Sequence, residues 1–239
     1  MKAIAVIPAR LASTRLPRKM LREIAGKPLV GWVYEAVRSS SLLADVIIAT
    51  DSDEILEACR SHGWKTQMTS PAHRSGTERV HEISNSIAAD VYINVQGDEP
   101  LVRSEQIATL LDVMKDPAVQ VGTVMTPCPS EEVKNPNAVK VVTIPGGRAL
   151  YFSRATIPFD RDGTDPRYFK HLGLYAYRKP ALDLFVSQPE STLEKSERLE
   201  QLRFFENGIA IYVGETSYDS VGVDTEEDLQ RVTEILRKR

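Results

Sequence analysis

The strongest constraint on the fold is the regular alternation of short apolar runs with helical segments in the first half of the chain. The runs are rich in β-branched residues and bounded by turn residues, which is typical of buried strands. They are Ala3 to Ile7, Val46 to Ala49, Val91 to Val95, Val121 to Met125 and Val139 to Ile144. Between the early runs, apolar residues recur at helical spacing from Leu29 to Val37, from Ile55 to Cys59 and from Ile107 to Met114. This alternation predicts βαβ units and an α/β fold of three layers, with a mainly parallel sheet between helices.

The second half is less regular. Proline, glycine and aspartate crowd residues 158–166, which predicts a long loop between Tyr151 and a strand from His171 to Tyr177. Two helices are expected after it, one from Leu193 to Glu206 and one from Thr225 to the C-terminus.

The length of 239 residues suits one large α/β domain, and no repeat or linker divides it. We therefore expect a single domain over residues 1–239, with a less regular region around 128–210. The balance of 30 basic against 33 acidic residues, with 42% hydrophobic residues, is unlike a disordered chain or a nucleic-acid binder. The two cysteines form no metal or disulfide pattern, and the apolar stretch Ala3 to Ala9 is too short for membrane insertion. A cytoplasmic protein is expected.

A basic loop follows the first strand. Between Pro8 and Arg22 there are five basic residues and no acidic one. They are Arg10, Arg15, Arg18, Lys19 and Arg22. In a parallel sheet, ligands bind beyond the carboxyl ends of the strands, so these cations with the Ser13 and Thr14 hydroxyls suit a polyphosphate. The loop lacks the P-loop and dinucleotide motifs, and a merely solvated basic loop is the alternative.

Two acidic segments lie far apart in the sequence. Asp98 follows the predicted strand Val91 to Val95 directly, where one carboxylate oxygen can hold Mg²⁺ while phosphates complete the shell. The alternative is that Asp98 or Glu99 merely starts the next helix. Asp224 precedes the last helix, where capping by Asp224 or Thr225 is the simplest account. Only its pairing with Asp98 makes Asp224 a candidate metal ligand.

Two further features are weaker by themselves. The segment Ser75 to Arg79 can frame a nucleobase, with Gly76 allowing close backbone approach and Thr77 capping the next helix. His171 opens a predicted strand, and a lone strand histidine is more often a hydrogen-bonded structural residue than a catalytic one.

Taken together, motifs along nearly the whole chain resemble one family, the 3-deoxy-manno-octulosonate (Kdo) cytidylyltransferases. The matching segments are Ile7 to Arg10, Ser13 to Pro17, Ser75 to Arg79, Asn94 to Pro100, Asn135 to Lys140, Ala149 to Pro158, His171 to Gly173, Leu199 to Arg203 and Gly222 to Thr225. Related cytidylyltransferases, including those acting on sialic acids, share the basic loop and the aspartate pair. The blocks from Tyr151 to Arg154 and from Leu199 to Arg203 are the specific part.

The resemblance implies a nucleotide-diphosphosugar-transferase (Rossmann-like) fold, a homodimer, and an Mg²⁺-dependent transfer of CMP from CTP to Kdo, with pyrophosphate as the second product. CMP-Kdo serves lipopolysaccharide synthesis. Residue by residue, the resemblance implies three groups of site residues. The catalytic groups would be Lys19 and the two metal ligands, Asp98 and Asp224. The nucleotide would be bound by Arg10, Ser13, Arg15, Lys19, Arg74, Ser75 and Gly76. The sugar would be bound by Gln96, Arg154, His171, Glu200 and Gln201.

The chain departs from the family pattern at one place, where Arg18 stands in a position that is usually glycine. Arg18 is either an extra phosphate ligand or a solvated side chain. The lack of a nucleophile motif agrees with the reaction, because phosphoryl transfer needs charge neutralisation and in-line placement more than a protein nucleophile. Two alternatives stay open: a cytidylyltransferase for another sugar acid, such as a sialic acid or an eight-carbon amino sugar, and a non-catalytic nucleotide-binding regulator. The presence of both Asp98 and Asp224 speaks against the regulator.

Overall fold

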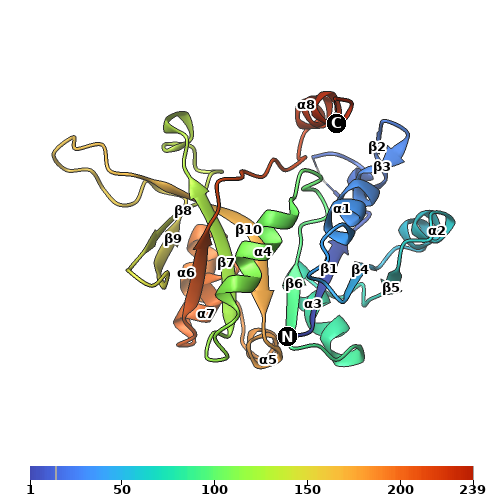
Figure 1. Cartoon of the computed structure of the whole chain (residues 1–239), viewed down its shortest axis with the longest axis horizontal. Coiled ribbons are helices and arrows are strands. Elements are labelled where there is room, and N and C mark those ends of the chain that lie inside the picture. Colours follow the sequence, from blue (N-terminus) through green and yellow to red (C-terminus); the bar gives the residue numbers. More distant parts are fainter. Residues whose placement is uncertain (14, 239) are drawn as a thin grey trace. The chain divides into compact units, whose positions relative to one another are not determined.

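The computed structural model describes residues 1–13 and 15–238, and the chain folds into two compact units (Figure 1). The first unit comprises Met1–Ile107 and Ser220–Arg239, and the second comprises Ala108–Asp219. Helix α4 (Ser104–Val113) begins in the first unit and ends in the second. In the described part of the chain, no helix is long and apolar enough to cross a membrane.

The first unit is built on four parallel strands. They are β1 (Ala3–Ala9), β4 (Asp45–Thr50), β5 (Thr66–Met68) and β6 (Val91–Asn94). Strand β1 lies between β4 and β6, with β5 beyond β4, and every pairing is parallel. The apolar runs predicted as strands in this half are confirmed. Both β1 and β4 are almost entirely buried, as expected for strands covered on both faces.

Helices connect these strands. They are α1 (Leu29–Arg38), α2 (Asp53–Ser61) and α3 (Gly76–Ser86), while α8 (Glu226–Leu236) returns at the end of the chain. Two short strands, β2 (Glu23–Ile24) and β3 (Lys27–Pro28), and the 3-10 turn η1 (Lys19–Leu21) lie between β1 and α1. The alternation of strand and helix gives the predicted α/β fold with a mostly parallel sheet.

The last helix is anchored to the base of the basic loop by an apolar cluster. Its members come from the basic loop, β2, α1, the loop after β6, the segment before α8 and α8 itself. They are Leu16, Ile24, Leu29, Leu101, Val223, Leu229, Val232 and Leu236. Burial of such side chains contributes about 1.5–3 kcal/mol each. The cluster therefore brings the segment just before α8 next to loops that precede it by more than a hundred residues.

The second unit contains five strands. They are β7 (Val121–Pro127), β8 (Lys140–Thr143), β9 (Ala149–Ser153), β10 (Phe169–Tyr177) and β11 (Ile211–Glu215). Strand β7 pairs parallel to β11 and antiparallel to β10, and β8 pairs antiparallel to both β9 and β10. Residues 154–168 form the long loop predicted before β10, and Phe159 in this loop is 83% exposed.

The helices of the second unit differ from the prediction. The single helix expected from Leu193 to Glu206 is wrong, because α6 (Thr192–Glu197) and α7 (Leu202–Glu206) are separate. Arg198 caps α6 in the left-handed region at φ 55°, a conformation that a continuing helix does not contain. Helix α5 (Lys179–Ser187) and the 3-10 turn η2 (Ser130–Glu132) complete the unit.

Candidate active site

A cavity of about 330 Å³ lies in the first unit, beyond the carboxyl ends of β1 and β6. Most of the predicted phosphate and metal residues line it. The lining residues are Pro8, Arg10, Ala12, Ser13, Arg15, Lys19, Met20, Gly76, Gln96, Asp98 and Asp224. Sequence reasoning did not single out Met20, which follows Lys19 directly and gives the cavity an apolar wall. The position agrees with the rule that parallel sheets bind ligands at this edge.

The centre of the cavity is an ion cluster around Lys19. Its Nζ lies 2.5 Å from Asp98 Oδ2 and 2.9 Å from Asp224 Oδ1. Arg15 Nη2 lies 3.0 Å from the other oxygen of Asp224. Burial by itself would lower the pKa of Lys19, but the two carboxylates outweigh it, so that pKa lies above its usual value. Two acids from distant parts of the chain therefore share one position that favours a cation.

Close backbone packing places Asp98 in this cluster. A Cβ on Gly97 would lie 2.7 Å from the carbonyl oxygen of Pro8, so a side chain there would force the loop away from the end of β1. The Asp98 carbonyl also accepts a hydrogen bond of 2.9 Å from the Val223 amide. Since α4 begins only at Ser104, the interpretation of Asp98 as a helix start is wrong.

The Asp224 carboxylate is not needed to cap helix α8, because the next residue does so. Thr225, not Asp224, is the N-cap of α8, and it forms a capping box with Asp228. The Thr225 Oγ1 accepts from the Asp228 amide at 3.2 Å, and Asp228 accepts from the Thr225 amide at 3.0 Å. Thr225 therefore caps the N-terminus of α8, and the Asp224 carboxylate is available to pair with Lys19 and Arg15.

Of the remaining residues of the basic loop, Arg10 and Ser13 make hydrogen bonds to the backbone, whereas Arg18 is exposed. Arg10 donates from Nη2 to the His73 carbonyl at 2.5 Å, and the Ser13 hydroxyl accepts from the Leu16 amide at 3.4 Å. Arg18 has a 62% exposed side chain that pairs with Glu54, and its backbone takes the left-handed conformation at φ 56° that suits the usual glycine. The structure thus places Arg18 at the surface. Thr14 lies outside the described residues.

The predicted nucleobase segment is only partly at the cavity. Gly76 lines it, and a Cβ there would lie 3.3 Å from the Pro8 ring. The N-cap of α3 is Ser75, whose hydroxyl accepts from the Glu78 amide at 3.2 Å, so the expected capping by Thr77 is wrong. Ser75 and Arg74 lie outside the lining given by the described residues.

The predicted sugar ligands are divided between the units. Gln96 lines the cavity of the first unit, whereas Arg154, His171, Glu200 and Gln201 belong to the second. The Arg154 guanidinium donates to three carbonyls: from Nε to Glu197 at 2.7 Å, from Nη1 to Pro136 at 3.0 Å and from Nη2 to Arg198 at 3.3 Å. These three bonds fix the position of the guanidinium through Nε, Nη1 and Nη2.

Two predicted sugar ligands of the second unit, His171 and Gln201, have buried polar atoms. Nε2 of His171 lies 2.9 Å from Thr123 Oγ1, and burial lowers the pKa of His171 to about 3. Gln201 is 5% exposed, and its buried amide nitrogen has no hydrogen-bond partner within the described chain. Burial, with contributions from Tyr177 and Glu200, raises the pKa of Tyr175, the ring neighbour of His171, well above its ordinary value. An unsatisfied buried donor needs an explanation, and a bound acceptor supplies one.

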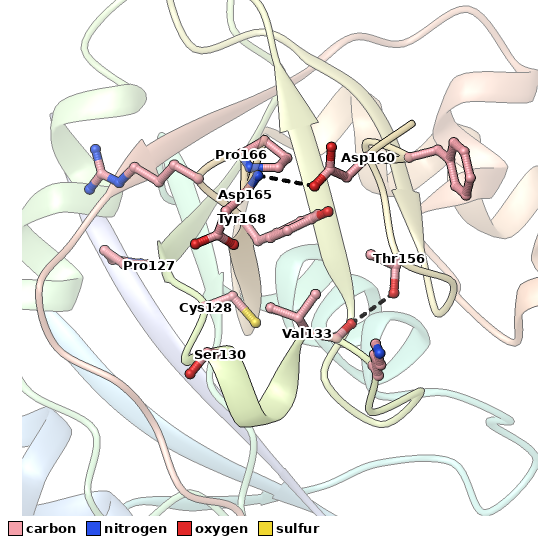
Figure 2. Close-up of a pocket in the computed structure, with 12 residues that line it drawn as sticks. Pro127, Cys128, Ser130, Val133, Thr156, Asp160, Asp165, Pro166 and Tyr168 are labelled. Atoms are coloured by element: carbon pink, nitrogen blue, oxygen red, sulfur yellow. Dashed lines mark hydrogen bonds between the residues drawn. The ribbon is translucent and has the colours of Figure 1, made fainter. Parts of the chain in front are cut away.

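A larger cavity of about 620 Å³ lies in the second unit, against the long loop (Figure 2). Cys128 and Tyr168 line it, and the Thr156 hydroxyl at its edge donates to the Val133 carbonyl at 3.0 Å. Among the described residues, its lining contains none of the predicted site residues. The larger of these two cavities is therefore not the one that the predicted phosphate and metal residues line.

The donor set around Lys19 fits Mg²⁺. Within residues 1–13 and 15–238, no group of three or more His, Cys, Asp or Glu side chains is arranged to hold a metal ion. Two carboxylates converge instead, on a position already taken by an ammonium group. Mg²⁺ commonly binds to one or two carboxylates and takes its other ligands from water and substrate phosphates.

Comparisons with known proteins agree with this geometry. The sequence model of a family described as Cytidylyltransferase matches residues 4–211. A protein of Koribacter versatilis named 3-deoxy-manno-octulosonate cytidylyltransferase is 66% identical over 239 residues, covering 100% of this chain and 91% of its own length. One of the same name from Acidobacterium capsulatum is 54% identical over 240 residues, covering 100% of this chain and 98% of its own length. A solved structure of CMP:2-keto-3-deoxy-manno-octonic acid synthetase complexed with CTP is 42% identical with a TM-score of 0.96, covering 100% of this chain and 99% of that one.

Proposed function

The chain belongs to the cytidylyltransferase family, among the 3-deoxy-manno-octulosonate cytidylyltransferases, and we propose that it transfers CMP from CTP to the anomeric hydroxyl of Kdo. Pyrophosphate is the second product, and CMP-Kdo is used for lipopolysaccharide synthesis. The observation that carries the proposal is the convergence of Asp98 and Asp224 beside the basic loop, in a chain similar over its full length to a synthetase complexed with CTP.

The basic loop would bind the triphosphate. Arg10, Arg15 and Ser13 offer guanidinium and hydroxyl donors at the edge of the sheet where backbone amides are also available. Lys19 neutralises part of the charge on Asp98 and Asp224 and keeps the two carboxylates together. This arrangement supplies what phosphoryl transfer needs, which is positioning and charge neutralisation without a covalent intermediate.

Asp98 and Asp224 would hold Mg²⁺. When bound, the ion neutralises phosphate charge and lowers the pKa of an attacking hydroxyl. Because the two aspartates come from segments joined by the contact of Val223 with Asp98, the ligand pair exists only in the folded first unit.

The residues proposed to bind Kdo are Gln96 in the first unit and Arg154, His171, Glu200 and Gln201 in the second. The unpartnered amide nitrogen of Gln201 supports a hydrogen bond to a sugar oxygen, and Glu200 supplies an acceptor for hydroxyls. Arg74 and Ser75, beside Gly76, would approach the cytosine.

The proposal includes a homodimer in the cytoplasm. Exposed Phe159 and Leu150, at 83% and 54%, give the second unit apolar surface that a second copy can cover. The two free thiols, Cys59 and Cys128, suit a reducing compartment. Light scattering of the wild type and of Phe159→Ser tests the dimer, and a monomeric wild type at micromolar concentration would contradict it.

The reaction is tested by pyrophosphate release with CTP and Kdo, in parallel with CTP and a sialic acid or an eight-carbon amino sugar. We expect release with Kdo and little with the other acids. No release with Kdo at millimolar substrate would overturn the proposal, and release only with another acid would favour the corresponding alternative. Binding of CTP without turnover on any acid would favour the regulator.

Asp98→Ala and Asp224→Ala are expected to abolish turnover while the far-UV circular dichroism spectrum stays that of the wild type. Each variant leaves the buried Lys19 one carboxylate partner and leaves the apolar cluster that holds α8 intact, so the fold should persist. Activity like that of the wild type in either variant would refute the assignment of the metal ligands.

A further inference from the structure

Strand β10 contains an irregularity next to His171. Leu172 of β10 is opposite Val124 of β7, but the next pair is Tyr175 with Thr123, so residues 173 and 174 are extra on the β10 side. Such a bulge removes carbonyls from the ladder and leaves them to find other donors. The Leu172 and Leu174 carbonyls, on either side of Gly173, both accept from a side chain of β7.

Thr123 fills the space opposite this bulge. Its side chain is fully buried, and its Oγ1 lies 2.8 Å from the Leu174 carbonyl and 3.4 Å from the Leu172 carbonyl. The third neighbour of the same oxygen is His171 Nε2, at 2.9 Å. One hydroxyl therefore faces two carbonyl oxygens and one imidazole nitrogen.

The proton positions follow from this set of neighbours. A hydroxyl has one proton and two lone pairs, and a carbonyl oxygen only accepts. If this proton went to His171 Nε2 instead, the hydroxyl and the Leu174 carbonyl oxygen would face each other at 2.8 Å with no hydrogen between them, so the proton is directed to the Leu174 carbonyl. Toward His171 the hydroxyl offers only a lone pair, so Nε2 must donate and must carry the proton. In a neutral imidazole, Nδ1 is then an acceptor.

We propose that Thr123 is a positioning residue that fixes His171 as the Nε2–H tautomer and so presents Nδ1 as a hydrogen-bond acceptor for a hydroxyl of the sugar acid. The identity of the ligand rests on the proposed function, whereas the tautomer rests on the strand geometry alone. An unprotonated Nδ1 attracts a hydroxyl and repels a carboxylate, so His171 would recognise the polyol part of the substrate and leave its acid group to other residues.

The surroundings of His171 agree with this role. The ring packs edge-on against Phe152, with centroids 4.9 Å apart at 78°, and lies 5.2 Å from the ring of Tyr175. These contacts fix the ring plane but cannot select which nitrogen is protonated. In the described part of the chain, no hydrogen bond reaches Nδ1, and part of the residue is accessible at the surface. Burial also keeps the imidazole neutral, since it lowers the pKa of His171 to about 3.

The tautomer is tested by NMR of the protein with ¹⁵N-labelled histidine. Four histidines are present, and the spectrum of His171→Gln identifies the signals of His171. We expect long-range ¹H–¹⁵N correlations of a neutral ring protonated at Nε2. A ring protonated at Nδ1, or a charged ring at pH 7, would overturn the proposal without any variant of Thr123.

Variants of Thr123 test its part. Thr123→Val keeps the shape but removes the hydroxyl, and is expected to let the Nδ1–H form become populated. Thr123→Ser restores the hydroxyl and should restore the single tautomer. Thr126→Val is the matched control, because Thr126 is also buried on β7 and makes no hydrogen bond to His171 in the described structure. An unchanged tautomer in Thr123→Val would refute the role of Thr123.

Kinetics then connect the tautomer to the substrate. In Thr123→Val we expect the KM for Kdo to rise about tenfold, as for one weakened hydrogen bond, with the KM for CTP changed less than about twofold. Thr123→Ser and Thr126→Val should keep the KM of the wild type. An unchanged KM for Kdo alongside an altered tautomer would refute the hydroxyl contact. Absence of any turnover with Kdo in the wild type would instead contradict the proposed function and leave the tautomer standing.

Discussion

Acidification should destabilise the fold through His171, by an amount that the structure allows to be worked out. Burial lowers the pKa of His171 to about 3, whereas in the unfolded chain it has the ordinary value of about 6.5. Between these values the unfolded state binds a proton that the folded state does not, so stability is complete above about pH 6.5 and falls as the pH drops toward 3. At pH 5 the loss relative to pH 8 is about 2 kcal/mol from this residue.

The measurement is urea unfolding at pH 8 and pH 5, for the wild type and for His171→Gln. Glutamine keeps an N–H donor for Thr123 but does not titrate, so the change with pH should be about 2 kcal/mol smaller in the variant. Other groups titrate in both proteins, and their contributions cancel in the difference. An equal loss of stability in both proteins would show that His171 is not held neutral by its surroundings.

Three substitutions separate the other contributions. Arg15→Gln should raise the KM for CTP in a salt-sensitive way, because Arg15 lines the cavity. Arg18→Gln should leave this KM unchanged, because Arg18 is exposed and pairs with Glu54. Equal effects of the two substitutions would contradict the role of Arg15 in binding phosphate. Glu194→Gln should lower the free energy of unfolding by about 3–5 kcal/mol in urea titrations, because it removes the carboxylate charge that pairs with the buried Arg203. A loss below about 1 kcal/mol would show that the pair is hydrated. Gly97→Ala should lower kcat at least about tenfold because it displaces the loop that carries Asp98. An unchanged kcat would mean that the loop tolerates a Cβ 2.7 Å from a carbonyl oxygen.

Much of the first unit could be predicted from the sequence because its strands are buried on both faces. Such strands appear as unbroken apolar runs, as in β1 and β4. Strands β9 and β11 were not predicted, although the sequence has apolar runs there, from Ala149 to Phe152 and from Ile209 to Val213. Buried and exposed positions are mixed along both strands, unlike β1 and β4. The break at Arg198 was missed because apolar spacing continues across it, and a left-handed arginine leaves no compositional signal.

The candidate site shows the same division. Lys19 lies in the loop after β1 and Asp98 in the loop after β6, so the topology alone places them at one edge of the sheet. The sequence could suggest the pairing of Asp98 with Asp224 but could not establish it, because the pairing depends on the packing of α8 against the base of the loop. The hydrogen bonds of Thr123 had no sequence signal at all, since single threonines are common in apolar strands and the role of this one arises from a bulge in the opposite strand.

The proposed chemistry depends above all on Asp98 and Asp224 binding one divalent cation together with CTP. Titration of Mn²⁺ in the presence of CTP, followed by electron paramagnetic resonance, tests this most directly in the wild type, Asp98→Asn and Asp224→Asn. Glu226→Gln is the control, because Glu226 begins α8 but pairs with Arg22 at 2.6 Å. We expect a protein-bound ion in the wild type and the control, and affinity weakened about tenfold or more in both aspartate variants. Mn²⁺ bound by either aspartate variant as tightly as by the wild type would contradict the shared metal site.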